Sequence, residues 1–210
     1  MEASEPRIDM PGPGERLNSG EVKPARPAAS VMVLRDGEGG PEVLLVLRNP
    51  EARFMGGAWV FPGGAVHADD ADPAAAAARE LGEEAGVTVE DASSLVPFSR
   101  WITPAEVEIR FDTFFYLVEA PAGAEGACDG EECVDLRWLS PAAALDAYQR
   151  DELLLVFPTI KHLQQLAEFE SVSQALEHAR MRKVQPVQPR VLIEGGVARV
   201  VLPGEPGYDD

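Results

Sequence analysis

The chain has 210 residues, of which 45% are hydrophobic and 26% are charged, and its formal net charge is −18 at pH 7. An acidic surface repels duplex nucleic acid and anionic membranes, so we expect neither as a partner. The sequence has no membrane-spanning apolar run and no secretory signal at its start, so it predicts a cytoplasmic protein. Two cysteines, Cys128 and Cys133, are too few for a disulfide scaffold or a four-cysteine zinc site.

The first residues differ in composition from the rest of the chain. They are rich in proline, glycine and charge and have no apolar period, so residues 1–28 are predicted to be a disordered tail. We expect a single domain over residues 29–210. Its core covers about residues 29–145, and a C-terminal helical extension covers about residues 146–210.

The domain is expected to open with two strands. Residues 30–34 and 43–47 are apolar, and residues 36–41, Asp-Gly-Glu-Gly-Gly-Pro, are typical of a turn between them. The pattern predicts an antiparallel hairpin whose second strand is buried on both faces. A short apolar strand is predicted over residues 58–61, between two glycine pairs.

A helix is predicted over residues 73–85. Asp72 suits the N-cap and Pro73 the first turn, five alanines propagate the helix, and Gly86 suits a left-handed C-terminal cap. Four apolar residues recur at helical spacing, so we expect them to face the core: Ala74, Ala78, Leu81 and Ala85.

The remaining elements alternate between strands and helices. Strands are predicted over residues 87–89, 95–102, 106–119 and 132–139. Helices are predicted over residues 141–148, 159–169 and, after a capping-box pattern, 171–183, and a hairpin over residues 190–194 and 197–202 follows. This order predicts a mixed β-sheet covered by helices, which is an α/β fold.

Three glutamates crowd one face of the helix over residues 73–85. Glu80, Glu83 and Glu84 stand at i, i+3 and i+4 near the helix C-terminus, where mutual repulsion and the helix dipole both disfavour them. A hard divalent cation would neutralise these carboxylates, and Arg79 can reach Glu83 one turn away. A solvated surface helix would be the better interpretation of these acids taken alone.

The turn that precedes the helix favours a binding site. Gly63 and Gly64, in the run Phe-Pro-Gly-Gly, allow backbone groups to approach a phosphate or a metal closely. A glycine turn that leads into a carboxylate-rich helix therefore offers both metal ligands and room for a diphosphate.

These residues resemble the Nudix hydrolase signature, G-x5-E-x7-R-E-U-x-E-E-x-G-U, where U is a bulky apolar residue. The run Arg79-Glu-Leu-Gly-Glu-Glu-Ala-Gly-Val87 fits the second half at every fixed position. In the first half, Gly64 is followed by five residues, then by Asp70 in place of Glu, then by eight residues in place of seven. The role of Asp70 therefore stays open, although an insertion with Asp is typical of the coenzyme A diphosphatase branch of the family.

A second segment resembles the same branch, that of the mammalian peroxisomal coenzyme A diphosphatase and its bacterial relatives. Arg48, Arg53 and Gly57 match the pattern that precedes the signature in this branch. The chain departs from that pattern at Val46, Asn49 and Met55. The resemblance covers about residues 29–145 well and the C-terminal helices loosely.

The resemblance implies a Nudix α/β/α sandwich, with a mixed β-sheet flanked by helices and with extra C-terminal helices and a terminal hairpin. It implies that water attacks a phosphorus of a small-molecule nucleotide-diphosphate substrate, assisted by Mg²⁺ or Mn²⁺. By similarity, Glu80, Glu83 and Glu84 are the metal ligands, and together with Arg79 they form the catalytic set. The expected substrate-binding residues are Arg48, Arg53, Gly63 and Gly64.

Several residues keep two interpretations. Glu132 stands six residues before Trp138, a spacing common near the active site of this family, so it is a candidate base or else an exposed strand residue. Arg48 and Arg53 bind a substrate phosphate or form structural ion pairs. We expect His67 to be a bystander and the histidines at 162 and 178 to lie on the surface. Core candidates that could also stack on an adenine are Trp59, Trp101, Phe111 and Phe114.

Three functions remain open. The first is a diphosphatase for coenzyme A or acyl-coenzyme A, and the second is a diphosphatase for ADP-ribose, NADH or another nucleotide, including a capped RNA end. Both fit the signature, because specificity lies in loops outside it. The third is a nucleotide-binding regulator without turnover, which the presence of all three helix glutamates disfavours. A homodimer is also left open.

Overall fold

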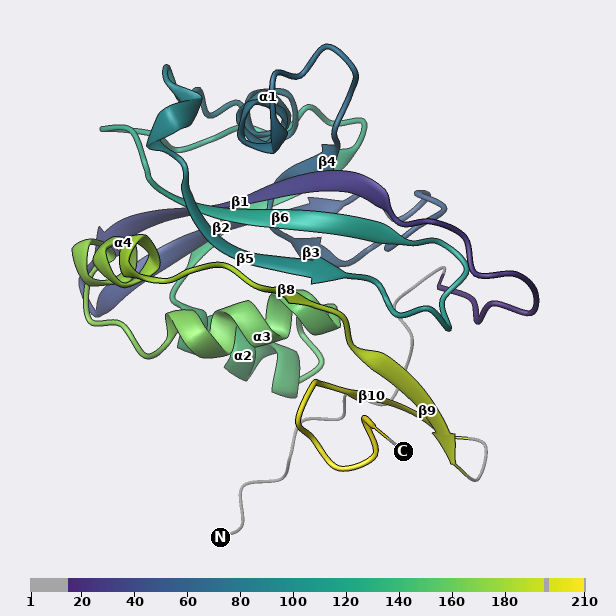
Figure 1. Ribbon diagram of the computed structural model, residues 1–210. Coiled ribbons are helices and arrows are strands. Elements are labelled where there is room, and N and C mark those ends of the chain that lie inside the picture. Colours follow the sequence, from purple (N-terminus) through teal and green to yellow (C-terminus); the bar gives the residue numbers. More distant parts are fainter. Residues whose placement is uncertain (1–14, 195–196, 210) are drawn as a thin grey trace, which may run out of the picture.

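The computed structural model describes residues 15–194 and 197–209. A mixed sheet forms the middle layer, helix α1 (Pro73–Ala85) covers one face, and three helices cover the other face (Figure 1). These three are α2 (Pro141–Gln149), α3 (Phe157–Leu166) and α4 (Val172–Met181). The expected α/β/α sandwich is confirmed.

Two parallel strands, β1 and β6, lie side by side in the middle of the sheet. Its order is β3-β2-β1-β6-β5-β8, with β4 paired to β1 and β7 paired to β2. The pairs β1·β6 and β5·β8 are parallel and the others are antiparallel. The strands are β1 (Arg26–Gly37), β2 (Gly40–Arg48), β3 (Trp59–Val60), β4 (Gly63–Ala65), β5 (Val96–Ile102), β6 (Phe111–Glu119), β7 (Cys133–Leu139) and β8 (Pro186–Val187).

Strand β1 shows why the sheet is buried on both sides. Val31 and Val33 pack toward α1, while Met32 and Leu34 pack toward the three-helix layer, and all four are fully buried. Alternate residues of a strand point to opposite faces, so a continuous apolar run buries both. The predicted β1–β2 hairpin is confirmed, with an antiparallel register.

Helix α1 begins and ends where its caps predict. The Asp72 side chain accepts a hydrogen bond from the Ala75 amide, and Gly86 adopts the left-handed conformation with φ of 63°. A second short hairpin, β9 (Arg190–Glu194) with β10 (Val197–Val201), lies beside the three-helix layer (Figure 1). Its expected turn at residues 195–196 lies outside the described residues.

Several predicted boundaries differ from the structure. The helix expected over residues 159–169 spans Phe157–Leu166, and the one expected over residues 171–183 spans Val172–Met181. Residues 106–110 form a turn, so β6 begins at Phe111, and residues 87–89 form no strand. Strand β1 begins at Arg26, before the expected domain start at residue 29. Part of the expected tail is ordered as well, because the Asn18 amide donates to the Glu106 carbonyl and the Glu108 amide to the Arg16 carbonyl. Residues 1–14 lie outside the described residues.

His162 is not on the surface, which corrects the expectation for this residue. Its side chain, on α3, is fully buried, and Nε2 lies 2.6 Å from the Ser99 hydroxyl. The aromatic rings around it are those of Phe61, Phe98, Trp101 and Phe115. Burial, opposed in part by the Pro158 carbonyl, lowers the pKa of His162 to about 3, so the ring is neutral at pH 7.

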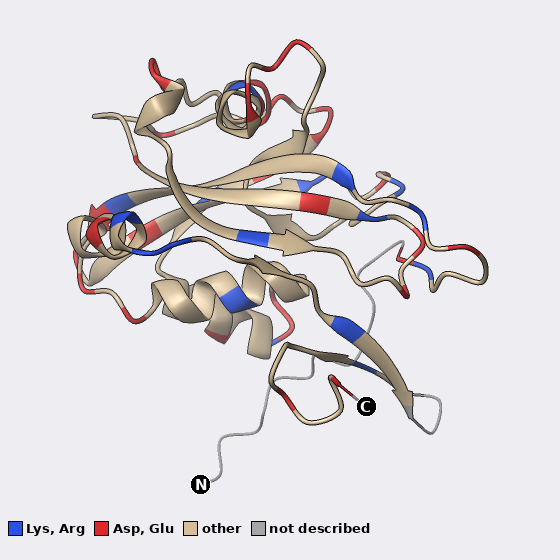
Figure 2. Ribbon diagram, in the orientation of Figure 1, with Lys and Arg blue, Asp and Glu red and all other residues tan. Residues whose placement is uncertain are grey.

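Most of the charged residues in the described part of the chain lie outside the helices and strands (Figure 2). Within the described residues, no helix is long and apolar enough to cross a bilayer. The core expectation is confirmed for Trp59 and Trp101, which are buried, whereas Phe111 and Phe114 are half-buried.

Candidate active site

The glycine turn before α1 packs directly against two helix glutamates. The Gly63 amide donates a hydrogen bond of 2.9 Å to Glu84 Oε2, and a Cβ added at Gly64 would overlap the Glu80 carboxylate. A Cβ at Gly63 would likewise overlap the backbone of Ala29 on β1. Only glycine allows this turn to lie between β1 and α1, which holds backbone groups against the carboxylates.

Arg79 joins three carboxylates. Its guanidinium donates to both oxygens of Asp70 at 3.1 and 3.0 Å, and its Nη1 donates to Glu80 and to Glu83 at 2.9 Å each. The Ala65 carbonyl accepts a fifth hydrogen bond, from Nη2. Asp70, the residue that departs from the signature, therefore pairs with Arg79 and holds its guanidinium in place. The Arg79 side chain lowers the pKa of Asp70 to about 2, so this carboxylate stays ionised.

Glu80 and Glu84 are buried, whereas Glu83 is exposed. The core face of α1 is therefore rotated from the predicted one: Ala76 and Ala77 are buried where Ala74 and Ala78 were expected. Burial raises the pKa of Glu80, and it raises the pKa of Glu84 to about 7. The neighbouring negative charges contribute to both increases.

Of the other residues predicted for the site, Arg48 and Glu132 line a cavity together with Glu80 and Glu83, whereas Arg53 does not. Arg48 Nη1 lies 3.7 Å from Glu84 Oε1, and its Nε is buried without a hydrogen-bond partner among the described residues. Glu132 is exposed, lines the same cavity and contributes to the raised pKa of Glu80 and Glu84. Arg53 is exposed in the turn after β2 and is not among the residues that line the cavity.

The donor set fits a hard divalent cation. Carboxylate oxygens are the ligands that Mg²⁺ and Mn²⁺ prefer, and Glu84 Oε1 is buried without a hydrogen-bond partner among the described residues. Over the same residues, no three Asp, Glu, His or Cys side chains already converge as a ligand group. Arg79 explains this arrangement, because it draws Glu80 and Glu83 toward its own guanidinium.

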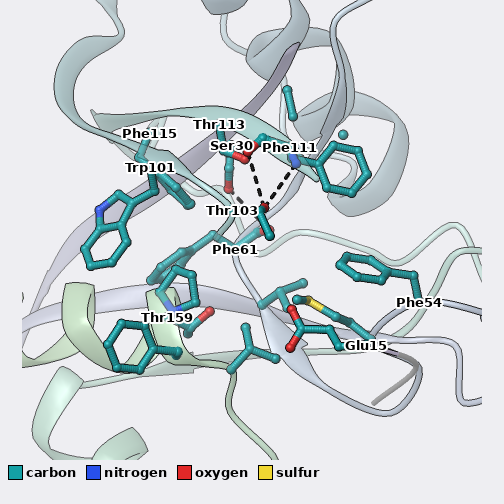
Figure 3. Close-up of a pocket in the computed structure, with 18 of the residues that line it drawn as sticks. Glu15, Ser30, Phe54, Phe61, Trp101, Thr103, Phe111, Thr113, Phe115 and Thr159 are labelled. Carbon is teal, nitrogen blue, oxygen red and sulfur yellow. Dashed lines mark hydrogen bonds between the residues drawn. The ribbon is translucent and has the colours of Figure 1, made fainter. Parts of the chain in front are cut away.

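Arg79, Glu80 and Glu83 line a cavity of about 680 Å³, which lies within the range of small-molecule sites. Arg48 and Glu132 line it as well, whereas Glu84 does not. Figure 3 shows the aromatic side chains of Phe61, Trp101, Phe111 and Phe115 around the same cavity, together with several hydroxyl groups. Arg26 also lines the cavity, although it was expected to belong to the disordered tail. Its guanidinium lies over the Phe111 ring, 5.0 Å from the ring centroid.

Comparisons with known proteins identify relatives of this chain and of its fold. A nudix hydrolase 7 of Caenorhabditis elegans, provisionally named, is 26% identical over 80% of this chain and 70% of its own length. A NUDIX hydrolase from Alicyclobacillus acidocaldarius superposes with a TM-score of 0.65 at 27% identity, covering 73% of this chain and 96% of its own. The NUDIX domain of Shewanella oneidensis NrtR, solved with ADP ribose, has a TM-score of 0.55 at 18% identity and shares the fold, over 70% of this chain and 88% of its own.

The family comparison is decisive. Residues 24–157, well over half of the chain, match the NUDIX domain. That segment holds the glycine turn, Asp70, Arg79 and the three helix glutamates. The chain belongs to the NUDIX domain family and is a Nudix hydrolase.

Proposed function

We propose that this chain hydrolyses the diphosphate bond of a nucleoside diphosphate linked to a second moiety, with Mg²⁺ or Mn²⁺ as cofactor. One observation carries the proposal: Glu80, Glu83, Arg79 and the glycine turn line a cavity whose wall also contains several aromatic side chains. Such a cavity suits a substrate with a charged centre and uncharged arms.

In this proposal Glu80, Glu83 and Glu84 hold the cation. When bound, a divalent cation neutralises diphosphate oxygens and lowers the pKa of a bound water. Glu84 offers the oxygen that has no hydrogen-bond partner among the described residues, and Arg79 orients Glu83 through their ion pair.

The remaining roles fall to groups that surround these acids. Arg48 contacts a substrate phosphate, because its guanidinium lines the cavity beside Glu84. Gly63 and Gly64 let the substrate approach the backbone. Glu132, a carboxylate that lines the cavity, accepts a proton from the attacking water. Arg53 has no role in this proposal, since it lies away from the cavity.

Coenzyme A or acyl-coenzyme A is the first substrate to test. Three residues match the coenzyme A diphosphatase pattern. Arg48 is the last residue of β2 and lines the cavity, whereas Arg53 and Gly57 lie in the turn that follows. ADP-ribose and NADH are the alternative substrates. The ADP ribose complex of the Shewanella domain motivates the first of these, although that protein shares only the fold.

The test is turnover, with Mg²⁺ or Mn²⁺, over coenzyme A, acetyl-coenzyme A, ADP-ribose, NADH, diadenosine polyphosphates and nucleoside triphosphates. For coenzyme A the expected product is adenosine 3′,5′-bisphosphate, separated by chromatography. A preferred substrate whose turnover is abolished in Glu83→Gln supports the proposal. Binding of these nucleotides with no turnover of any of them contradicts it and favours a regulator that only binds nucleotides.

A further inference from the structure

The two ends of the cavity differ in chemistry. One end holds Arg79, Glu80, Glu83 and Arg48. The other end is lined from β5, α3 and the β9–β10 hairpin, and every lining residue that these elements supply is uncharged. Those residues are Trp101, Ile102, Phe157, Pro158, Thr159, Ile160, Val191, Ala198 and Val200. We call this set the neutral compartment.

Most of the neutral compartment lies outside the NUDIX domain match. That match ends at residue 157, whereas residues 158–160, Val191, Ala198 and Val200 follow it in the sequence. Three more lining residues precede the match on the segment before β1: Glu15 and Arg16, which are charged, and the apolar Leu17. Parts of the chain that lie outside the family match therefore help to enclose the cavity away from the helix glutamates.

The enclosing segments are anchored to a single turn, residues 103–110. The Val191 amide donates to the Glu106 carboxylate, and the Arg190 guanidinium lies 3.9 Å from the same group. From the other side, the Asn18 amide donates to the Glu106 carbonyl and Leu17 forms a β-bridge with Val107. Backbone and ion-pair contacts hold both segments in place, so the compartment is a built part of the fold.

The hairpin also presents its apolar side chains in one direction. Val191 pairs with Val200 in the β9–β10 register, and directly paired residues point to the same face of a sheet. Both line the cavity together with Ala198, two residues before Val200 on the same strand. On the opposite face, Arg199 is exposed.

We infer that the neutral compartment binds an apolar arm carried on the distal phosphate of the substrate and selects substrates by the length of that arm. This inference rests on the proposed diphosphatase activity, because the arm is attached to the bond that is cleaved. The compartment is continuous with the carboxylate end, so one molecule can reach both. Burial of an aliphatic chain against Val, Ala and Phe side chains then adds affinity for each methylene removed from water.

The test uses methyl, butyl and octyl esters of ADP on the distal phosphate. Hydrolysis takes up one water and gives AMP and the alkyl phosphate, and kcat/KM is measured for each ester with Mg²⁺. We expect kcat/KM to rise about two- to fourfold per methylene until the compartment is filled. Equal kcat/KM for the methyl and octyl esters would overturn the inference.

Two variants locate the effect. Ala198→Trp, which fills the compartment, is expected to reduce the octyl-to-methyl ratio of kcat/KM at least tenfold. Ala142→Trp, the same substitution on the exposed surface of α2, is expected to leave the ratio unchanged. An unchanged ratio in folded Ala198→Trp protein would place the arm elsewhere and overturn the assignment.

Calorimetry of the same esters with the Glu83→Gln variant separates this inference from the proposed function. If the wild type hydrolyses neither the esters nor any nucleotide of the panel above, the proposed function fails, and binding then decides the inference. Affinity that rises with arm length supports the neutral compartment, and affinity that is independent of arm length rejects it.

Discussion

The two helical layers bury polar groups in opposite ways. On the α1 side, Glu80 and Glu84 are buried beside a cavity, and one carboxylate oxygen of Glu84 has no hydrogen-bond partner among the described residues. On the three-helix side, His162 is buried among four aromatic rings, and its pKa is lowered so that it carries no charge. In the α1 layer, the charge of the buried Glu84 carboxylate is unfavourable unless a bound cation offsets it. In the three-helix layer, the buried His162 ring is neutral and packs among aromatic side chains. The two faces of the sheet thus differ in the charge state of their buried polar groups.

The largest expected effect comes from a glutamate of the α1 layer. Glu83→Gln removes a proposed metal ligand that is exposed and makes one ion pair, so kcat should fall by about 10²–10³-fold while the unfolding midpoint stays the same. The matched control is Glu177→Gln, an exposed glutamate on α4, which should change neither quantity. Steady-state kinetics and thermal denaturation measure both. Equal activity of the two variants would contradict the proposal that α1 carries the metal-binding glutamates.

The second effect is a pH dependence of stability from the three-helix layer. The folded pKa of His162, about 3, lies below its ordinary value near 6.5, so the unfolded state takes up this proton first as the pH falls. The free energy of unfolding therefore decreases between pH 6.5 and pH 3, by about 3 kcal/mol at pH 4.5 from this group.

Urea denaturation of the wild type and His162→Gln tests this pH dependence. Gln can still reach Ser99 but does not titrate, so the stability advantage of the wild type at pH 7.5 should shrink by about that amount at pH 4.5. A difference between the two proteins that stays constant with pH would mean that the pKa of His162 is the same in the folded and unfolded states.

A smaller effect of opposite sign is expected from Glu84. Glu84→Gln keeps an acceptor for the Gly63 amide but removes a buried charge, so the metal-free protein should gain about 1–2 kcal/mol of stability at pH 8. Hydrolysis with Mg²⁺ should fall at the same time. Glu42→Gln, which breaks the ion pair with Arg35 on the β1–β2 hairpin, is the control and should be neutral or slightly destabilising. Denaturation in the presence of a chelator measures both, and a loss of stability in Glu84→Gln would show that its charge is well compensated.

The smallest effects test whether the layers also differ in ordinary helix stability. Asp72 caps α1 and Ser171 caps α4 through equivalent side-chain hydrogen bonds. Asp72→Ala and Ser171→Ala should each reduce the free energy of unfolding by about 1 kcal/mol with little change in kcat. A large loss of kcat in Asp72→Ala alone would extend the catalytic region to the first turn of α1.

The sequence predicted best those features that local chemistry decides. Helix α1 has the predicted bounds because Asp72 and Gly86 act on the backbone within a few residues. The β1–β2 hairpin was also predicted from local chemistry, because turn-forming residues separate its two apolar strands. The burial of His162 was missed, because a single helix gives no sign that aromatic side chains from β5 and β6 will surround it. The rotated core face of α1 was missed because the buried glutamates look like surface residues in a sequence pattern.

The same distinction holds for the candidate site. Arg79 and the helix glutamates lie within a short stretch of sequence, so spacing could predict the ion pair between Arg79 and Glu83. Placement of the more distant residues could not be predicted from spacing. Arg53 lies away from the cavity, whereas Val191 and Ala198 line it from the opposite end of the chain. Such contacts depend on tertiary structure and leave no local pattern.

The anchoring of both enclosing segments to residues 103–110 has a consequence for the order of folding. The glycine turn and α1 are close in sequence and can form as soon as they have been synthesised. The hydrogen bond from Val191 to Glu106 joins residues 85 positions apart, and contacts of such long range form late. During synthesis, the reactive end of the cavity can therefore take shape while its far wall is still missing. A nascent chain that stops before residue 190 should contain the carboxylate cluster without the means to distinguish one substrate arm from another.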